Sequence, residues 1–327
     1  MNRDLVPVIA RTTAVAKLGE VATPAIVDRA GGAAKFAWDE FFQGEIRSEL
    51  TRKAYTHAVR LFLGWCEARG VELSQITPGM VGQYFNEHTG GPATKKQHLA
   101  AVRKLFDKLV VRHAVIINPA HSVRIARYEV IEGKTPEIGV DHARKLLDSI
   151  DTSNIVGLRD RAIIGVLIYT AARVGAVSKL RLKNLEHDGS QWTLRFDEKG
   201  GKSREIPVRH DLEGFVLAYR DVARLLGEPK ESPLFRSAVG RTKLLTANRM
   251  SAIDMCRMVK RRMKDAGLPA RLSPHSFRVT TITDLLEQGV PLEDVQYLAG
   301  HADSRTTSLY DRRKKRVSRN IVERISI

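Results

Sequence analysis

Apolar side chains recur at helical spacing through much of the first third of the chain. Between residues 48 and 69, five of them share one face of a helix: Ala54, Ala58, Leu61, Phe62 and Trp65. Ser48 is a suitable N-cap for this helix, and Gly70 is a suitable end. Similar patterns over residues 77–85 and 92–113 predict two further helices. The pattern therefore predicts a small, all-helical domain of about four helices.

Breaks in this pattern divide the chain into four segments. We predict an N-terminal arm over residues 1–34, which is disordered or a loosely attached helix, and a helical domain over residues 35–126. Residues 127–138 contain a glycine, a proline and several charges without periodicity, which indicates a linker. A second domain with a C-terminal tail is expected over residues 139–327.

The second domain combines helical periods with a short stretch of alternation. Trp192, Leu194 and Phe196 alternate with polar residues, and Ile206 and Val208 do likewise after a glycine-rich turn. This arrangement predicts a β-hairpin. Helical patterns fall near residues 140–150, 156–170, 175–182, 211–226, 247–266, 274–288, 292–299 and 303–310. The expected fold class is mainly α with a small β-sheet: an all-α N-terminal domain followed by an α+β domain.

The charge balance indicates the class of partner. The 327 residues include 54 Lys and Arg against 37 Asp and Glu, which gives a net charge of +17. An excess of this size indicates a polyanion, usually nucleic acid or an acidic membrane surface, although a merely basic protein is the plainer alternative. Residues 1–134 carry +6 and residues 135–327 carry +11. Because the excess is not concentrated in a tail, we expect both halves to face the same partner.

The cysteines, the N-terminus and the length of the apolar runs indicate the cellular compartment. Cys66 and Cys256 follow no metal-ligand spacing, so two free buried thiols in a reducing cytosol are expected. The N-terminus lacks a secretory pattern, and no run approaches the ~18 apolar residues of a membrane span. We therefore expect a cytoplasmic protein without a membrane partner.

Candidate chemistry begins at residues 273–278, which read SPHSFR. Ser273 is a suitable N-cap and Pro274 a suitable first helical residue, so His275 and Arg278 share the first turn of a helix. A helix N-terminus already favours anions. By itself the pair would equally suit a solvated helix start.

Further on, Gly300-His301 ends one predicted helix, and Tyr310 follows nine residues after that histidine. With the earlier residues, this sequence resembles the tyrosine recombinase, or phage integrase, family, including its Xer-type resolving enzymes. The site residues of the family match this chain in order at Arg173, Lys199, His275, Arg278, His301 and Tyr310. The resemblance covers nearly the whole chain, because residues 51–55 and 118–120 look like the family's N-terminal core-binding, SAM-like domain.

The resemblance implies a site-specific recombinase that cuts and rejoins duplex DNA with neither a metal nor another cofactor. Tyr310 would attack the phosphodiester and form a 3′-phosphotyrosine. Arg173 and Arg278 would contact the non-bridging oxygens, since planar, always-charged guanidinium groups suit the charge that grows there. His301 would donate a further hydrogen bond to the same oxygens.

The resemblance also makes His275 the base or proton relay, and makes Lys199 in the hairpin turn the acid that protonates the departing 5′ oxygen. Alternatives stay open for three residues. Lys202, in the same turn, could replace Lys199 as the acid. Arg173 amid small residues would also suit a buried ion pair, and Tyr310 would also suit a packing aromatic.

Two positions depart from the family pattern. The family usually has an acidic residue three after the first arginine, where this chain has Ala176, so we expect a different rate or regulation. Ala299 stands where leucine is commoner before Gly-His. The basic run over residues 312–316 suits phosphate contact, and the family's tail often docks on a neighbouring subunit. An apolar stripe suited to such docking follows: Val317, Ile321, Val322 and Ile325.

The expected partners are double-stranded DNA with inverted-repeat half-sites and further copies of this chain, as a homo-tetramer in the synaptic complex. Accessory DNA-bending proteins or a second recombinase stay open as partners. The target sequence and the biological role, whether integration, excision, resolution or transposition, also stay open. A type IB topoisomerase, a telomere resolvase and a catalytically degenerate DNA-binding regulator are the alternatives. The N-terminal domain and the complete set of residues favour the recombinase.

Overall fold

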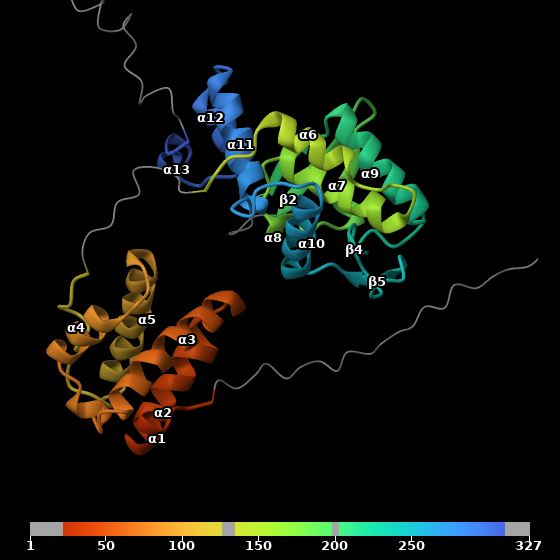
Figure 1. Cartoon of the computed structure of the whole chain (residues 1–327). Coiled ribbons are helices and arrows are strands. Elements are labelled where there is room, and N and C mark those ends of the chain that lie inside the picture. The colour runs from red at the N-terminus through yellow and green to blue at the C-terminus, as the bar shows by residue number, and fades with distance from the viewer. Residues whose placement is uncertain (1–21, 126–134, 198–202, 311–327) are drawn as a thin grey trace, which may run out of the picture. The chain divides into compact units, whose positions relative to one another are not determined.

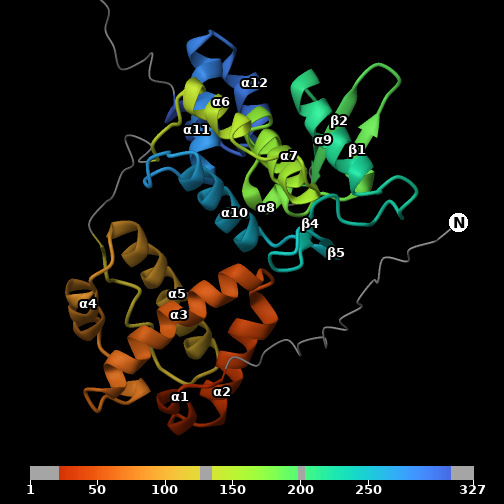
Figure 2. The same cartoon turned by 45° about the vertical axis from the view of Figure 1, so that its right-hand side comes forward.

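The computed structural model describes residues 22–125, 135–197 and 203–310. The described residues fall into two compact units (Figures 1 and 2), which we call the N-terminal unit, residues 22–125, and the C-terminal unit, residues 135–310. The first is all-helical, and the second combines helices with small sheets. The fold class that the sequence predicts is therefore confirmed.

The N-terminal unit contains five α-helices among its described residues: α1 (Ala25–Arg29), α2 (Gly32–Asp39), α3 (Glu49–Glu67), α4 (Pro78–Glu87) and α5 (Pro92–Val111). A π-helical turn, η1 (Glu40–Glu45), extends α2, and a 3-10 turn, η2 (Leu73–Gln75), precedes α4. The predicted caps form. The Ser48 hydroxyl accepts a hydrogen bond from the Thr51 amide at 3.4 Å, and Thr77 caps α4 in the same way.

Aromatic side chains fill the core of the N-terminal unit. Phe41, Phe42, Phe62 and Phe106 are fully buried, and the rings of Phe62 and Phe106 meet edge to face at 6.3 Å. Helix α1 joins this core because its Ile26 and Val27 side chains are also fully buried. Residues 25–34, which the sequence pattern assigned to the N-terminal arm, therefore pack on the helical unit. Residues 1–21 of the predicted arm lie outside the described residues.

Eight α-helices form the C-terminal unit over its described residues: α6 (Val140–Asp148), α7 (Ile155–Tyr169), α8 (Val174–Val177), α9 (His210–Val222), α10 (Ala252–Asp265), α11 (Pro274–Glu287), α12 (Leu292–Ala299) and α13 (Ser304–Ser308). Helix α7 is central: α6, α9, α10 and α11 all pack against it (Figure 1). Its Ile163, Ile164 and Val166 side chains are fully buried for that reason.

A three-stranded antiparallel sheet contains the predicted hairpin. Strands β2 (Trp192–Asp197) and β3 (Ser203–Pro207) pair with Leu194 opposite Ile206 and Phe196 opposite Arg204. A short strand that the sequence pattern did not reveal, β1 (Leu185–His187), pairs with β2 after a 3-10 turn, η3 (Leu182–Asn184).

A second, two-stranded sheet corrects the expectation of one sheet. Strand β4 (Arg236–Ala238) pairs with β5 (Leu245–Arg249), so the helix predicted from residue 247 begins instead at Ala252. The Ser251 hydroxyl caps that helix by accepting from the Asp254 amide at 3.1 Å. The prediction was wrong because pairing with the neighbouring strand β4 outweighed the local helical pattern.

Two further findings concern the cysteines and membranes. Cys66 is buried and Cys256 is half-buried, and both are free thiols. Across the described part of the chain, no helix has the length and apolarity needed to cross a bilayer.

Candidate active site

The first turn of α11 presents two predicted site residues in different ways. Ser273 caps the helix, and its amide donates to the Ser276 hydroxyl at 3.1 Å, which fixes the chain's entry. His275 is exposed, whereas the Arg278 side chain is only 1% exposed. The Nη1 of Arg278 donates a hydrogen bond to the Ala171 carbonyl oxygen. The buried guanidinium is therefore fixed against the segment that leads to Arg173.

That segment is a tight turn between α7 and α8. Ala171 is fully buried with φ +49°, a left-handed conformation that is uncommon for a residue with a Cβ and costs of order 1 kcal/mol or more. Arg173 is the N-cap residue of α8, and its Nη1 donates to the Gly300 carbonyl at 3.3 Å. Arg173 is exposed, so the alternative of a buried ion pair for this residue does not hold.

The third part of the site lies where α12 ends. Gly300 adopts φ 60° and ψ 47°, the left-handed helix end that glycine allows. His301 follows and is 7% exposed, with its Nδ1 2.9 Å from the Thr307 hydroxyl. If that hydroxyl donates to Nδ1, the proton of the neutral ring sits on Nε2, from which it can be donated to an anion.

Tyr310 lies beside this histidine. The two rings are nearly parallel, at an interplanar angle of 10° and a centroid distance of 5.9 Å. The Tyr310 amide donates to the Thr307 carbonyl at 3.0 Å, so one residue positions both the histidine ring and the tyrosine backbone. Apolar atoms of Ala171 and α12 pack in the same cluster as Tyr310.

Charge is concentrated around the two histidines. The pKa of His301 is lowered to about 3, mostly by burial, with smaller contributions from Arg278, Arg173, His275 and Arg204. The pKa of His275 is also lowered, first by partial desolvation from the neighbouring atoms and then by the Arg278 and Arg173 charges. Both imidazoles are therefore neutral at neutral pH, next to guanidinium groups that stay charged. Such a site suits an anion, because guanidinium groups form strong charge-assisted hydrogen bonds with anionic oxygens.

The structure brings five of the six predicted site residues together: Arg173, His275, Arg278, His301 and Tyr310. The sixth, Lys199, and its alternative Lys202 lie outside the described residues. The same holds for the basic run over residues 312–316 and for the apolar stripe of the tail: Val317, Ile321, Val322 and Ile325. Ala176 is half-buried and packs against the main core of the unit.

Sequence reasoning missed three residues that shape the site. Thr307 hydrogen-bonds His301, Ala171 forms the turn, and Arg204 lies buried on β3 with its charge acting on His301. Only Thr307 had a local signal, because it stands three residues before the tyrosine. The roles of Ala171 and Arg204 depend on contacts between distant segments.

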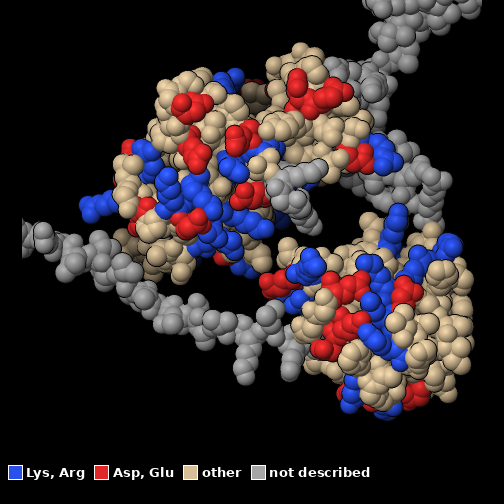
Figure 3. All heavy atoms as spheres, turned by 180° about the vertical axis from the view of Figure 1, so that it is seen from behind, with Lys and Arg blue, Asp and Glu red and all other residues tan. Residues whose placement is uncertain are grey.

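Basic side chains extend beyond the site. Figure 3 shows Lys and Arg gathered densely on the visible face of the C-terminal unit, whereas basic and acidic side chains alternate on the N-terminal unit. Helix α10 contributes four exposed cations: Arg257, Lys260, Arg261 and Lys264. A surface of this kind suits a phosphate backbone. In the parts of both units that are described, no group of three or more His, Cys, Asp or Glu side chains could hold a metal ion.

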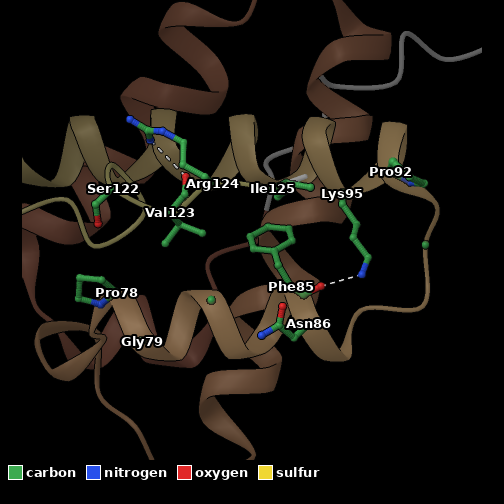
Figure 4. A pocket seen from close by; sticks show the side chains of 12 residues that line it. Pro78, Gly79, Phe85, Asn86, Pro92, Lys95, Ser122, Val123, Arg124 and Ile125 are labelled. Atoms are coloured by element: carbon green, nitrogen blue, oxygen red, sulfur yellow. Dashed lines mark hydrogen bonds between the residues drawn. The ribbon is translucent and has the colours of Figure 1, made fainter. Parts of the chain in front are cut away.

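A surface pocket of about 720 Å³ opens in the N-terminal unit, between α4 and the segment that follows α5 (Figure 4). Lys95 borders it, and its Nζ donates to the Phe85 carbonyl at 2.8 Å. The predicted site residues all belong to the other unit. The pocket is therefore not part of the candidate active site.

Comparison with protein families gives the class. Residues 138–316 match the phage integrase family, and residues 37–113 match the N-terminal SAM-like domain of phage integrases. The chain belongs to the phage integrase family of tyrosine recombinases, which are enzymes that cut and rejoin DNA strands. The resemblance that the sequence motifs indicate is thereby confirmed.

Among individual relatives, the chain is similar to Xer recombinases. It is 30% identical to the tyrosine recombinase XerD of Ralstonia nicotianae, covering 80% of this chain and 82% of that protein. It is 29% identical to the tyrosine recombinase XerC of Shigella flexneri, covering 80% and 85%.

Solved structures share the fold. The XerH site-specific recombinase bound to its palindromic difH substrate superposes with a TM-score of 0.68 at 19% identity, covering 90% of this chain and 86% of that one. A lambda integrase tetramer bound to a Holliday junction gives a TM-score of 0.61 at 18% identity, covering 89% and 82%.

Proposed function

We propose that this enzyme recombines specific duplex DNA sites through a covalent 3′-phosphotyrosyl link at Tyr310. The observation that carries the assignment is the convergence of Tyr310, the neutral His301 ring and two arginines at one point of the C-terminal unit. Family membership supplies the reaction class. The geometry supports these particular side chains as the ones that perform it.

The chemistry needs a fixed cationic clamp on the phosphate. Arg278 is buried and tied to a backbone carbonyl, so its guanidinium is held in place before substrate binds. Arg173 is exposed and makes one long hydrogen bond to Gly300, so it can turn to a non-bridging oxygen at little cost. His301 donates from Nε2 to the same oxygens while Thr307 holds its other nitrogen.

The reaction exchanges one phosphoester bond for another. The Tyr310 oxygen bonds to phosphorus, and the bond between phosphorus and the 5′ oxygen breaks. The phenol proton leaves with the help of His275, and Lys199 gives a proton to the departing 5′ oxygen. The phenol needs this help because the free pKa of tyrosine is ~10. The bond energy stays in the phosphotyrosine, so resealing is the same step in reverse.

The substrate and the assembly are finer parts of the same proposal. We place the enzyme in the cytoplasm as a homo-tetramer on two duplexes with inverted-repeat half-sites. The structures of XerH bound to its palindromic difH substrate and of a lambda integrase tetramer bound to a Holliday junction support this arrangement by analogy. The domains predicted at 35–126 and 139–327 would each contact DNA, with the linker over 127–138 between them.

Removal of the nucleophile tests the proposal. Tyr310→Phe should bind target DNA like the parent and form no covalent adduct on a nicked suicide substrate. Tyr297→Phe is the matched control, because Tyr297 lies on α12 with 58% of its surface exposed. Tyr310→Phe that still gave an adduct in denaturing gels would refute the assignment. Relaxation of plasmids without any special site would favour a type IB topoisomerase instead.

The acid is tested with a modified leaving group. Lys199→Ala should cleave slowly but recover when the bridging 5′ oxygen is replaced by sulfur, because a thiolate departs without a proton. Lys202→Ala, three residues further along the chain, is the control. Recovery of Lys202→Ala in place of Lys199→Ala would move the role three residues along the chain.

A further inference from the structure

Arg204 is a buried cation that the reaction scheme above does not use. It is the second residue of β3, and its side chain is 4% exposed. Its guanidinium lies 5.0 Å from the centre of the Phe196 ring, directly across the hairpin. A buried guanidinium is costly unless its partners compensate for the lost water. The position of those partners therefore indicates what the residue does.

Arg204 forms a hydrogen bond with the turn that precedes Arg173. Its Nη1 donates to the Thr170 carbonyl at 3.4 Å, and the next carbonyl along the chain, that of Ala171, accepts from Arg278. Two arginines from distant elements thus hold two consecutive carbonyls. The left-handed Ala171 lies between them, and a strained residue of this kind persists only where its surroundings hold it.

Arg204 also lies close enough to His301 for its charge to act on the imidazole. Strand β3 packs against α12, the helix that ends just before His301. The same strand begins immediately after residues 198–202, which include Lys199. Arg204 therefore lies a few residues after Lys199 in the sequence, bonds the turn that precedes Arg173, and lies near His301.

We propose that Arg204 is a positioning residue of the recombinase site, whose guanidinium holds the Thr170–Arg173 turn so that Arg173 reaches the scissile phosphate. This inference rests on the role of Arg173 in the proposed function. Arg204 acts through Arg173 and the backbone, and it does not itself contact the reacting atoms.

Single-turnover cleavage of a nicked suicide substrate tests this role. Arg204→Met keeps an unbranched side chain in the cavity but removes the hydrogen bond and the charge. We expect its cleavage rate to fall about 10–100-fold, the scale of an active-site displacement, with a much smaller change in the dissociation constant for DNA. Arg159→Met is the control, because Arg159 is 2% exposed and bonds Asp160 within the same unit. That control should lose stability while its folded fraction cleaves normally.

Two more readouts separate positioning from simple destabilisation. The double variant Arg173→Ala/Arg204→Met should cleave no more slowly than Arg173→Ala alone, because both changes remove the same interaction. Arg204→Lys should restore part of the rate, since lysine keeps the charge and a hydrogen-bond donor but lacks the planar fork.

Several results would overturn the proposal. Wild-type cleavage by Arg204→Met would do so, as would fully additive losses in the double variant. If Arg204→Met does not fold, Arg204→Lys decides the question, and wild-type cleavage by that variant overturns the role. The proposed function fails separately: if Tyr310→Phe forms no adduct while Arg204→Met cleaves normally, only the inference about Arg204 is wrong.

Discussion

The two units bury different kinds of side chain. Of the twelve buried polar or charged side chains among the described residues, eleven belong to the C-terminal unit, and His98 is the exception. The N-terminal unit has a core of aromatic and aliphatic groups. The C-terminal unit surrounds a similar apolar core with buried arginines, threonines and a histidine. This difference agrees with the proposed function, in which the C-terminal unit carries out the phosphate chemistry and needs charge held in place.

The buried charges of the C-terminal unit fall into two groups. Asp160 is fully buried but accepts from Arg159 at 2.7 Å and from Arg262 at 2.8 Å, so its charge is balanced. Arg278 and Arg204 bond backbone carbonyls of the turn before Arg173. The first group joins α7 to α10 through a carboxylate. The second places buried guanidinium groups at the candidate site.

The largest loss of stability is expected from a change in the apolar core of the N-terminal unit. Phe106→Ala should lower the free energy of unfolding by about 3–5 kcal/mol, because a fully buried ring leaves a cavity. Denaturant unfolding with hydrogen exchange read on each unit measures the effect. Phe106→Leu, with a smaller cavity, is the control and should lose clearly less. An equal loss in both would show that the ring does not pack as described.

A change at Arg278 should separate stability from activity. Arg278→Met should slow single-turnover cleavage about 10²–10³-fold, which corresponds to about 2.7–4 kcal/mol of transition-state stabilisation. Its free energy of unfolding should fall by only about 1 kcal/mol, because the Ala171 carbonyl loses a buried hydrogen bond while an apolar side chain replaces a buried cation. Arg144→Met, on α6 with 74% of its side chain exposed, is the control for both measurements. A large stability loss in Arg278→Met would make this arginine structural.

His301 should make stability depend on pH. Its pKa is about 3 in the folded protein and 6.5 as the ordinary value, so below pH 6.5 the unfolded chain takes up a proton that the folded chain does not. The free energy of unfolding should therefore fall by about 1–2 kcal/mol from pH 7 to pH 5 through this group. His301→Asn should remove this contribution to the fall in the free energy of unfolding between pH 7 and pH 5. His210→Asn, at an exposed histidine on α9, should leave the fall unchanged.

The smallest effect is expected at the surface of the N-terminal unit. Lys53 lies 2.7 Å from Glu49 one turn away on α3, and both side chains are more than 70% exposed. Solvent and side-chain entropy offset such a pair. Lys53→Ala should leave the free energy of unfolding within experimental error of the parent. A clear loss would mean that this unit also depends on charge, which would weaken the contrast between the units.

The local features of the fold could be predicted from the sequence. Ser48, Thr77 and Ser273 cap helices where the pattern placed them, and Gly300 ends α12 as expected. The alternation around Leu194 also predicted the hairpin. These features depend on hydrogen bonds and side-chain spacing within a few residues, so they are written in the local sequence. The second sheet was missed because β4 and β5 lack the alternation of apolar and polar residues that marks the first hairpin, and residues 247–249 also fit a helical pattern.

The sequence by itself determined the residue types of the candidate site and their order, and through them the family. It did not determine how those residues sit. Only the tertiary structure decided that Arg278 is buried while His275 is exposed on the same helical turn, and that Thr307 bonds His301. It also decided that Arg204 and Arg278 meet consecutive carbonyls of the Arg173 turn. The reason is physical. The hydrogen bonds of Arg204 and Arg278 join segments that are 34 and 107 residues apart in the chain. Burial and charge depend on the packing of the whole unit rather than on neighbours in the chain.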